Sequence, residues 1–132
     1  MFSELKATSL RKGVFVMAHQ HQSCVDACVR CAQECECCAN QCLGDMPECA
    51  RLCIDCADAC WSCTAFMSRD SEFSAELCDI CATICDACAA ECEKHDNEHC
   101  RRCAEACRRC AEECRKMSKS AGTRQQSVGA AR

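Results

Sequence analysis

The stretch CRRCAEACRRCAEEC, residues 100–114, places five cysteines in fifteen positions at gaps of three, four, three and four. Residues three or four apart lie on one face of an α-helix, and this alternation is typical of the buried seam of a helical bundle. A β-strand would need gaps of two. The intervening Ala, Glu and Arg favour helix and keep the outer face polar. The stretch therefore predicts a helix whose buried side is lined with sulfur.

The same spacing recurs in four blocks along the chain. Of the 22 cysteines, all but Cys37 follow it. Cys37 falls at a heptad position that points away from the seam, so we expect a surface thiol or one that faces the N-terminal segment. The seam cysteines are Cys24, Cys28, Cys31, Cys35, Cys38 and Cys42; Cys49, Cys53, Cys56, Cys60 and Cys63; Cys78, Cys81, Cys85, Cys88 and Cys92; and Cys100, Cys103, Cys107, Cys110 and Cys114.

Short breaks separate the four blocks. The first contains Gly44, Asp45 and Pro47, the second spans residues 68–71, and the third spans residues 94–97. Because short links join antiparallel neighbours, the sequence predicts an all-α protein, an antiparallel up-down-up-down four-helix bundle over residues 23–117. The candidate N-caps of the last two helices are Asp70 or Ser71, and Asp96 or Asn97.

The two ends of the chain differ from this core. Residues 1–22 carry their own apolar pattern, which predicts a short extra N-terminal helix, and residues 118–132 are small and polar, which predicts a disordered tail. The apolar run over residues 13–18 is too short for a signal sequence or a membrane span. We therefore expect a cytoplasmic protein with no membrane partner. The net charge is -4, and no basic stripe with interleaved aromatics is present, so nucleic acid is not expected as a partner either.

A seam of cysteine and alanine leaves the centre of a bundle underfilled. The chain has only four Phe, one Trp and no Tyr, and no Leu, Ile, Val, Phe or Trp lies between Cys85 and Lys116. Empty core volume costs about 1 kcal/mol per missing methyl group. In a reducing cytoplasm, thiol-lined space of this kind selects soft metal ions.

Monovalent copper suits continuous rows of thiolates better than zinc does. Cu(I) takes two or three sulfurs and tolerates sulfurs that bridge neighbouring ions, whereas zinc prefers four ligands at closed tetrahedral sites. The eight CxxC pairs lie in continuous rows with no division into fours. We therefore predict storage of many Cu(I) ions, roughly ten to twenty by counting one or two thiolates per ion. A zinc or cadmium buffer of the metallothionein kind and a thiol redox buffer are the alternatives.

The predicted metal ligands are the seam cysteines together with three neutral donors at one end of the bundle. His95 and His99 lie one helical turn apart just before Cys100, and Met46 lies in the first connection. Imidazole and thioether groups can pass Cu(I) inward without trapping it. At the opposite end we expect a hydrophobic plug, made by Phe66, Met67 and Phe73 among others. No set of nucleophile, base and orienting residue is visible, so no enzyme is predicted.

Three segments closely resemble the bacterial copper storage proteins, in the cytosolic branch that lacks an export signal. They are HQSCVDACVRCAQECECCANQC (21–42), CARLCIDCADACWSC (49–63) and CEKHDNEHCRRCAEACRRCAEECRKM (92–117). The resemblance covers roughly residues 19–117. It implies a cysteine-lined four-helix bundle that stores many Cu(I) ions without catalysis, Met or His at its open end, and assembly into a homotetramer.

Overall fold

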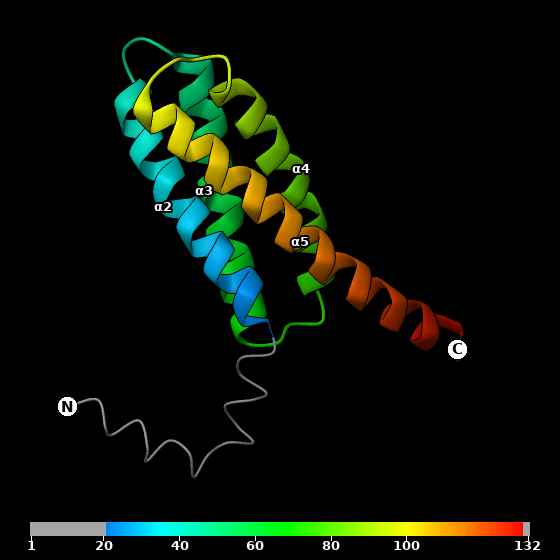
Figure 1. The fold of residues 1–132 in the computed structure, drawn as a ribbon. Coiled ribbons are helices and arrows are strands. Elements are labelled where there is room, and N and C mark those ends of the chain that lie inside the picture. Colours follow the sequence, from blue (N-terminus) through cyan, green and yellow to red (C-terminus); the bar gives the residue numbers. More distant parts are fainter. Residues whose placement is uncertain (1–20, 131–132) are drawn as a thin grey trace, which may run out of the picture.

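The computed structural model describes residues 21–130 and the side chains of residues 21–120. Within this range the chain forms four helices and no strand: α2 (Gln22–Cys42), α3 (Pro47–Ser68), α4 (Ser74–Cys92) and α5 (Glu98–Ala130). They run alternately up and down as an antiparallel bundle (Figure 1). Each of α2 and α4 packs against both α3 and α5. The predicted four-helix bundle is confirmed, and the predicted N-terminal helix lies outside the described residues except for residues 21 and 22.

The connections begin and end where helix-breaking and capping residues stand. Pro47 is the first residue of α3, a position at which its missing N–H costs nothing. Asn97 precedes α5, and its Oδ1 accepts a hydrogen bond from the backbone N–H of Cys100 at 3.1 Å. Asn97 is therefore the N-cap that the sequence predicts for this helix.

The start of α4 differs from the prediction. The helix begins at Ser74, with Phe73 at its N-cap and no capping hydrogen bond from a side chain. The hydroxyl of Ser71 instead accepts a hydrogen bond from the N–H of Phe73 at 3.1 Å. Asp70 has a φ of 53°, in the left-handed region. These two residues thus form the turn before the helix and do not cap it.

Helix α5 is longer than the sequence predicts. Figure 1 shows its C-terminal part projecting beyond the other helices, and residues 118–130 continue the helix where a disordered tail is expected. The single proline of the chain is Pro47, so no residue after α5 begins blocks the propagation of its hydrogen bonds.

The core is made of cysteine and alanine. Every seam cysteine is buried, and alanines at flanking positions, such as Ala32, Ala57 and Ala82, are buried beside them. Large apolar side chains lie largely outside, since five of them are exposed by 40% to 65%: Leu43, Ile54, Trp61, Phe73 and Ile80. Among the described residues, no helix has the length and hydropathy that crossing a membrane requires.

Ion pairs hold α5 in register against its two neighbours. Arg108 pairs with Asp86 of α4 at 3.3 Å and with Glu93 at 2.8 Å. Arg102 pairs with Glu34 of α2 at 3.3 Å. Because these groups are partly exposed, water and salt screen each pair, so its contribution to stability is small.

Candidate metal centre

The sulfur atoms of the four helices meet along the axis of the bundle. Cys31 of α2 has its Sγ 3.6 Å from that of Cys107 of α5 and 3.8 Å from that of Cys56 of α3. The Sγ of Cys56 lies 3.6 Å from that of Cys85 of α4. One cysteine from each helix therefore contributes to a single layer of close sulfurs.

Neighbouring layers share their sulfurs. Several groups of four cysteines have sulfurs that all lie within 4.8 Å of one another. Cys31, Cys35 and Cys107 each belong to two of these groups, so three of the groups overlap. The other two groups join this column through the sulfur contacts of Cys28 with Cys110 at 3.6 Å and of Cys53 with Cys103 at 3.8 Å. The groups include Cys28, Cys63, Cys81 and Cys114; Cys31, Cys60, Cys85 and Cys110; Cys31, Cys35, Cys56 and Cys107; Cys35, Cys88, Cys103 and Cys107; and Cys38, Cys49, Cys53 and Cys92.

The sulfur spacing suits metal–thiolate bonds. Three sulfurs that each lie about 2.3 Å from one ion, the distance found for zinc thiolates, are about 4 Å apart. The contacts between Cys35 and Cys103 and between Cys53 and Cys103 are 3.6 and 3.8 Å. Ions can therefore occupy the column with little movement of the helices. One isolated group also fits four-coordinate zinc, but the shared sulfurs favour an ion that accepts bridging ligands.

All 22 cysteines are free thiols in the structure. Cys37 is half-buried and contributes to none of the sulfur contacts described above. This agrees with its position outside the seam spacing. The seam cysteines thus form one set, and Cys37 is available as a control position on the same helix.

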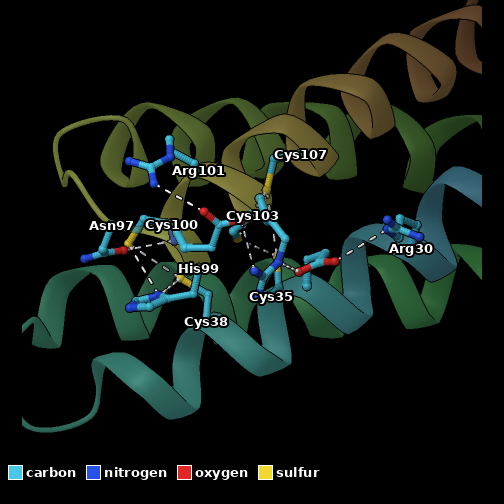
Figure 2. Close-up of polar contacts among 12 residues, drawn as sticks. Arg30, Cys35, Cys38, Asn97, His99, Cys100, Arg101, Cys103 and Cys107 are labelled. Carbon is cyan, nitrogen blue, oxygen red and sulfur yellow. Dashed lines mark hydrogen bonds and ion pairs between the residues drawn. The ribbon is translucent and has the colours of Figure 1, made fainter.

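His99 lies at one end of the column and faces its sulfurs. Its Nδ1 is 3.3 Å from the Sγ of Cys38 and 3.6 Å from the Sγ of Cys100 (Figure 2). The residue is half-buried, so the ring joins the surface to the sulfur column. Met46, at the N-cap of α3, is half-buried and packs against the cysteine core.

His95 is differently placed, although the sequence groups it with His99. Its Nε2 lies 3.1 Å from a carboxylate oxygen of Glu91, one turn earlier. Lys94 and His95 hold the pKa of the Glu91 carboxyl below its usual range. Glu91 is not among the residues predicted from the sequence for this end, although its four-residue spacing from His95 indicates such a pair.

The opposite end is closed by methionine. Met67 is buried, and its Sδ lies 3.7 Å from the Sγ of Cys78. Met117 is also buried, and Phe66 is half-buried. Phe73 is 57% exposed, so its predicted place in the plug is wrong. The reason is that α4 begins one residue after Phe73, which therefore points to solvent at a helix end.

Thiols near the His99 end hold their protons strongly. Burial raises the pKa of Cys100 to about 11, and the neighbouring Cys38 adds to the shift. Burial likewise raises the pKa of Cys42 to about 12. The pKa of Cys49 is raised as well, by burial and by a neighbouring thiol. At neutral pH these residues are neutral thiols, so metal binding to them releases protons.

This gives the metal-free protein an expected dependence on pH. In the folded state, Cys100 and Cys42 keep their protons above the ordinary thiol pKa of 9.0, because their pKa values are raised to about 11 and about 12. The stability that the neutral thiols of Cys42 and Cys100 contribute is therefore complete below pH 9 and is lost as the pH rises through this window. The loss is up to about 1.4 kcal/mol per pH unit for each such thiol.

Far-UV circular dichroism of the reduced, metal-free protein is expected to show helix at neutral pH and an unfolding temperature that falls above pH 9. The Cu(I)-loaded protein is the control. If the seam cysteines bind copper as predicted, they are already thiolates in this form, and its unfolding temperature should depend less on pH. An unfolding temperature of the metal-free form that stays constant across this window would show that the thiols are not buried.

Comparisons with known proteins agree with this geometry. The model of the copper storage protein family matches residues 17–119. The chain is 45% identical to the metal-free copper storage protein 3 of Bacillus subtilis, with 74% of this chain and 97% of that chain covered and a TM-score of 0.71. It is 40% identical to the Streptomyces lividans copper storage protein loaded with 10 copper equivalents, with 73% and 81% covered and a TM-score of 0.69. No curated protein sequence matches it significantly.

Proposed function

The chain belongs to the copper storage protein family, and we propose that it stores roughly ten to twenty Cu(I) ions, at one or two thiolates per ion, in the sulfur column of its bundle. The observation that carries this proposal is the overlap of the cysteine groups, in which Cys31, Cys35 and Cys107 each belong to two groups. A sulfur shared between groups serves as a bridge between neighbouring ions. The loading of the Streptomyces relative with 10 copper equivalents supports a number in this range.

The balance of charge supports the upper part of this range. A buried ladder of thiolates without counterions would carry a severe desolvation and repulsion penalty. One Cu(I) per thiolate cancels the charge of the column. Cysteines such as Cys31, Cys56 and Cys85 are fully buried, so water contributes little to this compensation. We therefore expect filling to continue until ions and seam thiolates are nearly equal in number.

An anaerobic titration tests the stoichiometry. The reduced protein is titrated with Cu(I) in the presence of a competing chelator, and the endpoint is read from the chelator's absorbance. The account predicts an endpoint between roughly ten and twenty ions per chain. An endpoint near four or five, the number expected at about four cysteines per site, would favour closed zinc-type sites and contradict the proposal.

We propose that Cu(I) enters at the His99 end. The His99→Ala variant is expected to load on the order of tenfold more slowly, which corresponds to losing about 1.4 kcal/mol of stabilisation of the entering ion. Its final capacity should stay unchanged, because the imidazole contacts Cys38 and Cys100 but does not replace them. Stopped-flow transfer of Cu(I) from a chelator measures the rate.

His95→Ala is the matched control for this prediction. The His95 ring faces Glu91, so its removal should slow loading less than removal of His99. Equal loading rates in the wild type and in His99→Ala would contradict the proposed role of His99. An equal slowing in both variants would indicate that both imidazoles contribute to entry, and would contradict a special role of His99.

We further propose a homotetramer without catalytic activity that works in the cytoplasm. A reducing compartment keeps the thiols free to bind copper. The exposed apolar side chains of Ile54, Trp61 and Ile80 offer surface for contact between copies. Size-exclusion chromatography with light scattering measures the assembly, and a monomer at micromolar concentration would contradict this part of the proposal.

A further inference from the structure

Two methionines continue the cysteine seam at the end opposite His99. Met67 follows Cys63 on α3 by four residues, and Met117 follows Cys114 on α5 by three. Both keep the alternating spacing of the seam. Met67 is 3% exposed and Met117 is 9% exposed, so both side chains point into the bundle as the cysteines do.

The sulfur atom of Met67 faces the column. The thiol of Cys78, on the neighbouring helix α4, donates a hydrogen bond to the Sδ of Met67 at 3.7 Å. A hydrophobic plug needs only hydrocarbon, which leucine provides without sulfur. In Met67, however, a lone pair of the thioether sulfur is directed at a thiol, so that two soft metal ligands lie side by side. The orientation of Met67 is therefore that of a ligand.

Further thiols lie at the same end. The Sγ of Cys114 is 3.8 Å from that of Cys24 and 3.8 Å from that of Cys28. A metal ion beside Met67 thus has Cys78 as a direct partner, and the thiols of Cys24, Cys28 and Cys114 lie at the same end.

Among the described residues, the histidine at this end, His21, does not face the sulfur column as His99 does at the other end. The Nε2 of His21 lies 3.3 Å from the Oδ1 of Asp70, so this nitrogen is paired with a carboxylate outside the column. The ring of His99, by contrast, lies within 3.6 Å of two thiols. The two ends therefore differ in the neutral donor that faces their thiols, which is His99 at one end and Met67 at the other.

We propose that Met67 is a Cu(I) ligand, and that its Sδ and the Sγ of Cys78 hold the last ion of the column at the end opposite His99. This inference rests on the proposed storage of Cu(I). An ion bound by one thiolate and one neutral thioether forms a site without net charge, which is the least costly combination at a buried end. The thioether is the weaker donor of the two, so this ion binds late and leaves early.

Met67→Leu tests this assignment, and Met117→Leu, which removes the other buried methionine of this end, is the matched control. Exchange of Met for Leu conserves volume and keeps the plug closed. The protein is labelled in its methionine methyl groups and titrated with Cu(I) by NMR and against a competing chelator. We expect the methyl resonance of Met67 to shift late in the titration. In Met67→Leu, the last ion should bind at least about tenfold more weakly, a loss of about 1.4 kcal/mol, while the unfolding temperature of the metal-free form stays unchanged.

The outcomes separate this inference from the storage function. An unchanged Met67 resonance in a protein that loads fully would overturn the inference and leave storage intact. So would a last ion that binds equally tightly in the wild type and in Met67→Leu. A wild-type protein that stops near four or five ions would instead overturn the storage function itself, at about four cysteines per ion.

Discussion

A quadruple variant with serine in place of four central seam cysteines is expected to bind about two to four fewer copper ions per chain, at one or two thiolates per ion. The four cysteines, whose sulfurs lie within 4.8 Å of one another, are Cys31, Cys35, Cys56 and Cys107. Serine is close to cysteine in size, but its hard oxygen has little affinity for Cu(I). Because Cys31, Cys35 and Cys107 also belong to neighbouring groups, ions above and below lose bridging sulfurs as well. The anaerobic chelator titration measures the change.

Cys37→Ser is the control for the quadruple variant. Cys37 lies on the same helix as Cys31 and Cys35 but makes none of the described sulfur contacts, so its replacement should leave the capacity unchanged. Circular dichroism checks that the quadruple variant folds. If it does not, the single variants Cys31→Ser and Cys107→Ser carry the test, each with an expected loss of about one ion or less. Full capacity in a folded quadruple variant would contradict the shared column.

Loading with Cu(I) is expected to raise the unfolding temperature by at least about 20 °C. A ligand bound only by the folded state stabilises by about 4 kcal/mol per site when its concentration is 1,000 times its dissociation constant. Each 1 kcal/mol shifts the midpoint by roughly 4 to 8 °C in a domain of this kind. Copper that binds cysteines of the unfolded chain reduces this gain in stability. The expected shift therefore counts only about 4 kcal/mol, the contribution of one site, and not the sum over all sites.

The physical reason for this large effect is the composition of the core. Cys28, Cys60 and Ala57 are fully buried where larger aliphatic residues would usually pack. Ions that bridge sulfurs of different helices, as proposed, would cross-link the bundle. Calorimetry of the reduced protein at increasing copper loading measures the shift. We expect the midpoint to rise in steps as the column fills. Equal midpoints for the metal-free and fully loaded protein would place the copper outside the bundle.

The fold follows from the sequence because the seam spacing specifies both the helices and their buried faces. Pro47 and Asn97 stand at helix starts in the structure as the sequence predicts. The pairing of particular sulfurs, such as Cys31 with Cys107, could not be predicted. It depends on the order of the helices around the axis and on their relative height, neither of which the spacing contains.

The ends of the column were predicted less well than its middle. Side chains at helix ends take their direction from local partners, as His95 does from Glu91. The sequence places His95 and His99 together, but only His99 faces sulfur. The sequence also marks Met67 as apolar filling, and only the structure reveals that its sulfur faces Cys78. The length of α5 was underestimated because polar residues without periodicity can extend a helix that is already nucleated.

A crystal structure of the fully loaded protein, with anomalous scattering measured at the copper edge, would show directly whether copper fills the sulfur column. The account predicts a column of copper positions along the bundle axis, each bound to two or three seam sulfurs, with sulfurs such as those of Cys31 and Cys107 shared between neighbouring ions. Copper on the outer surface, or isolated four-coordinate ions that share no sulfur, would contradict it.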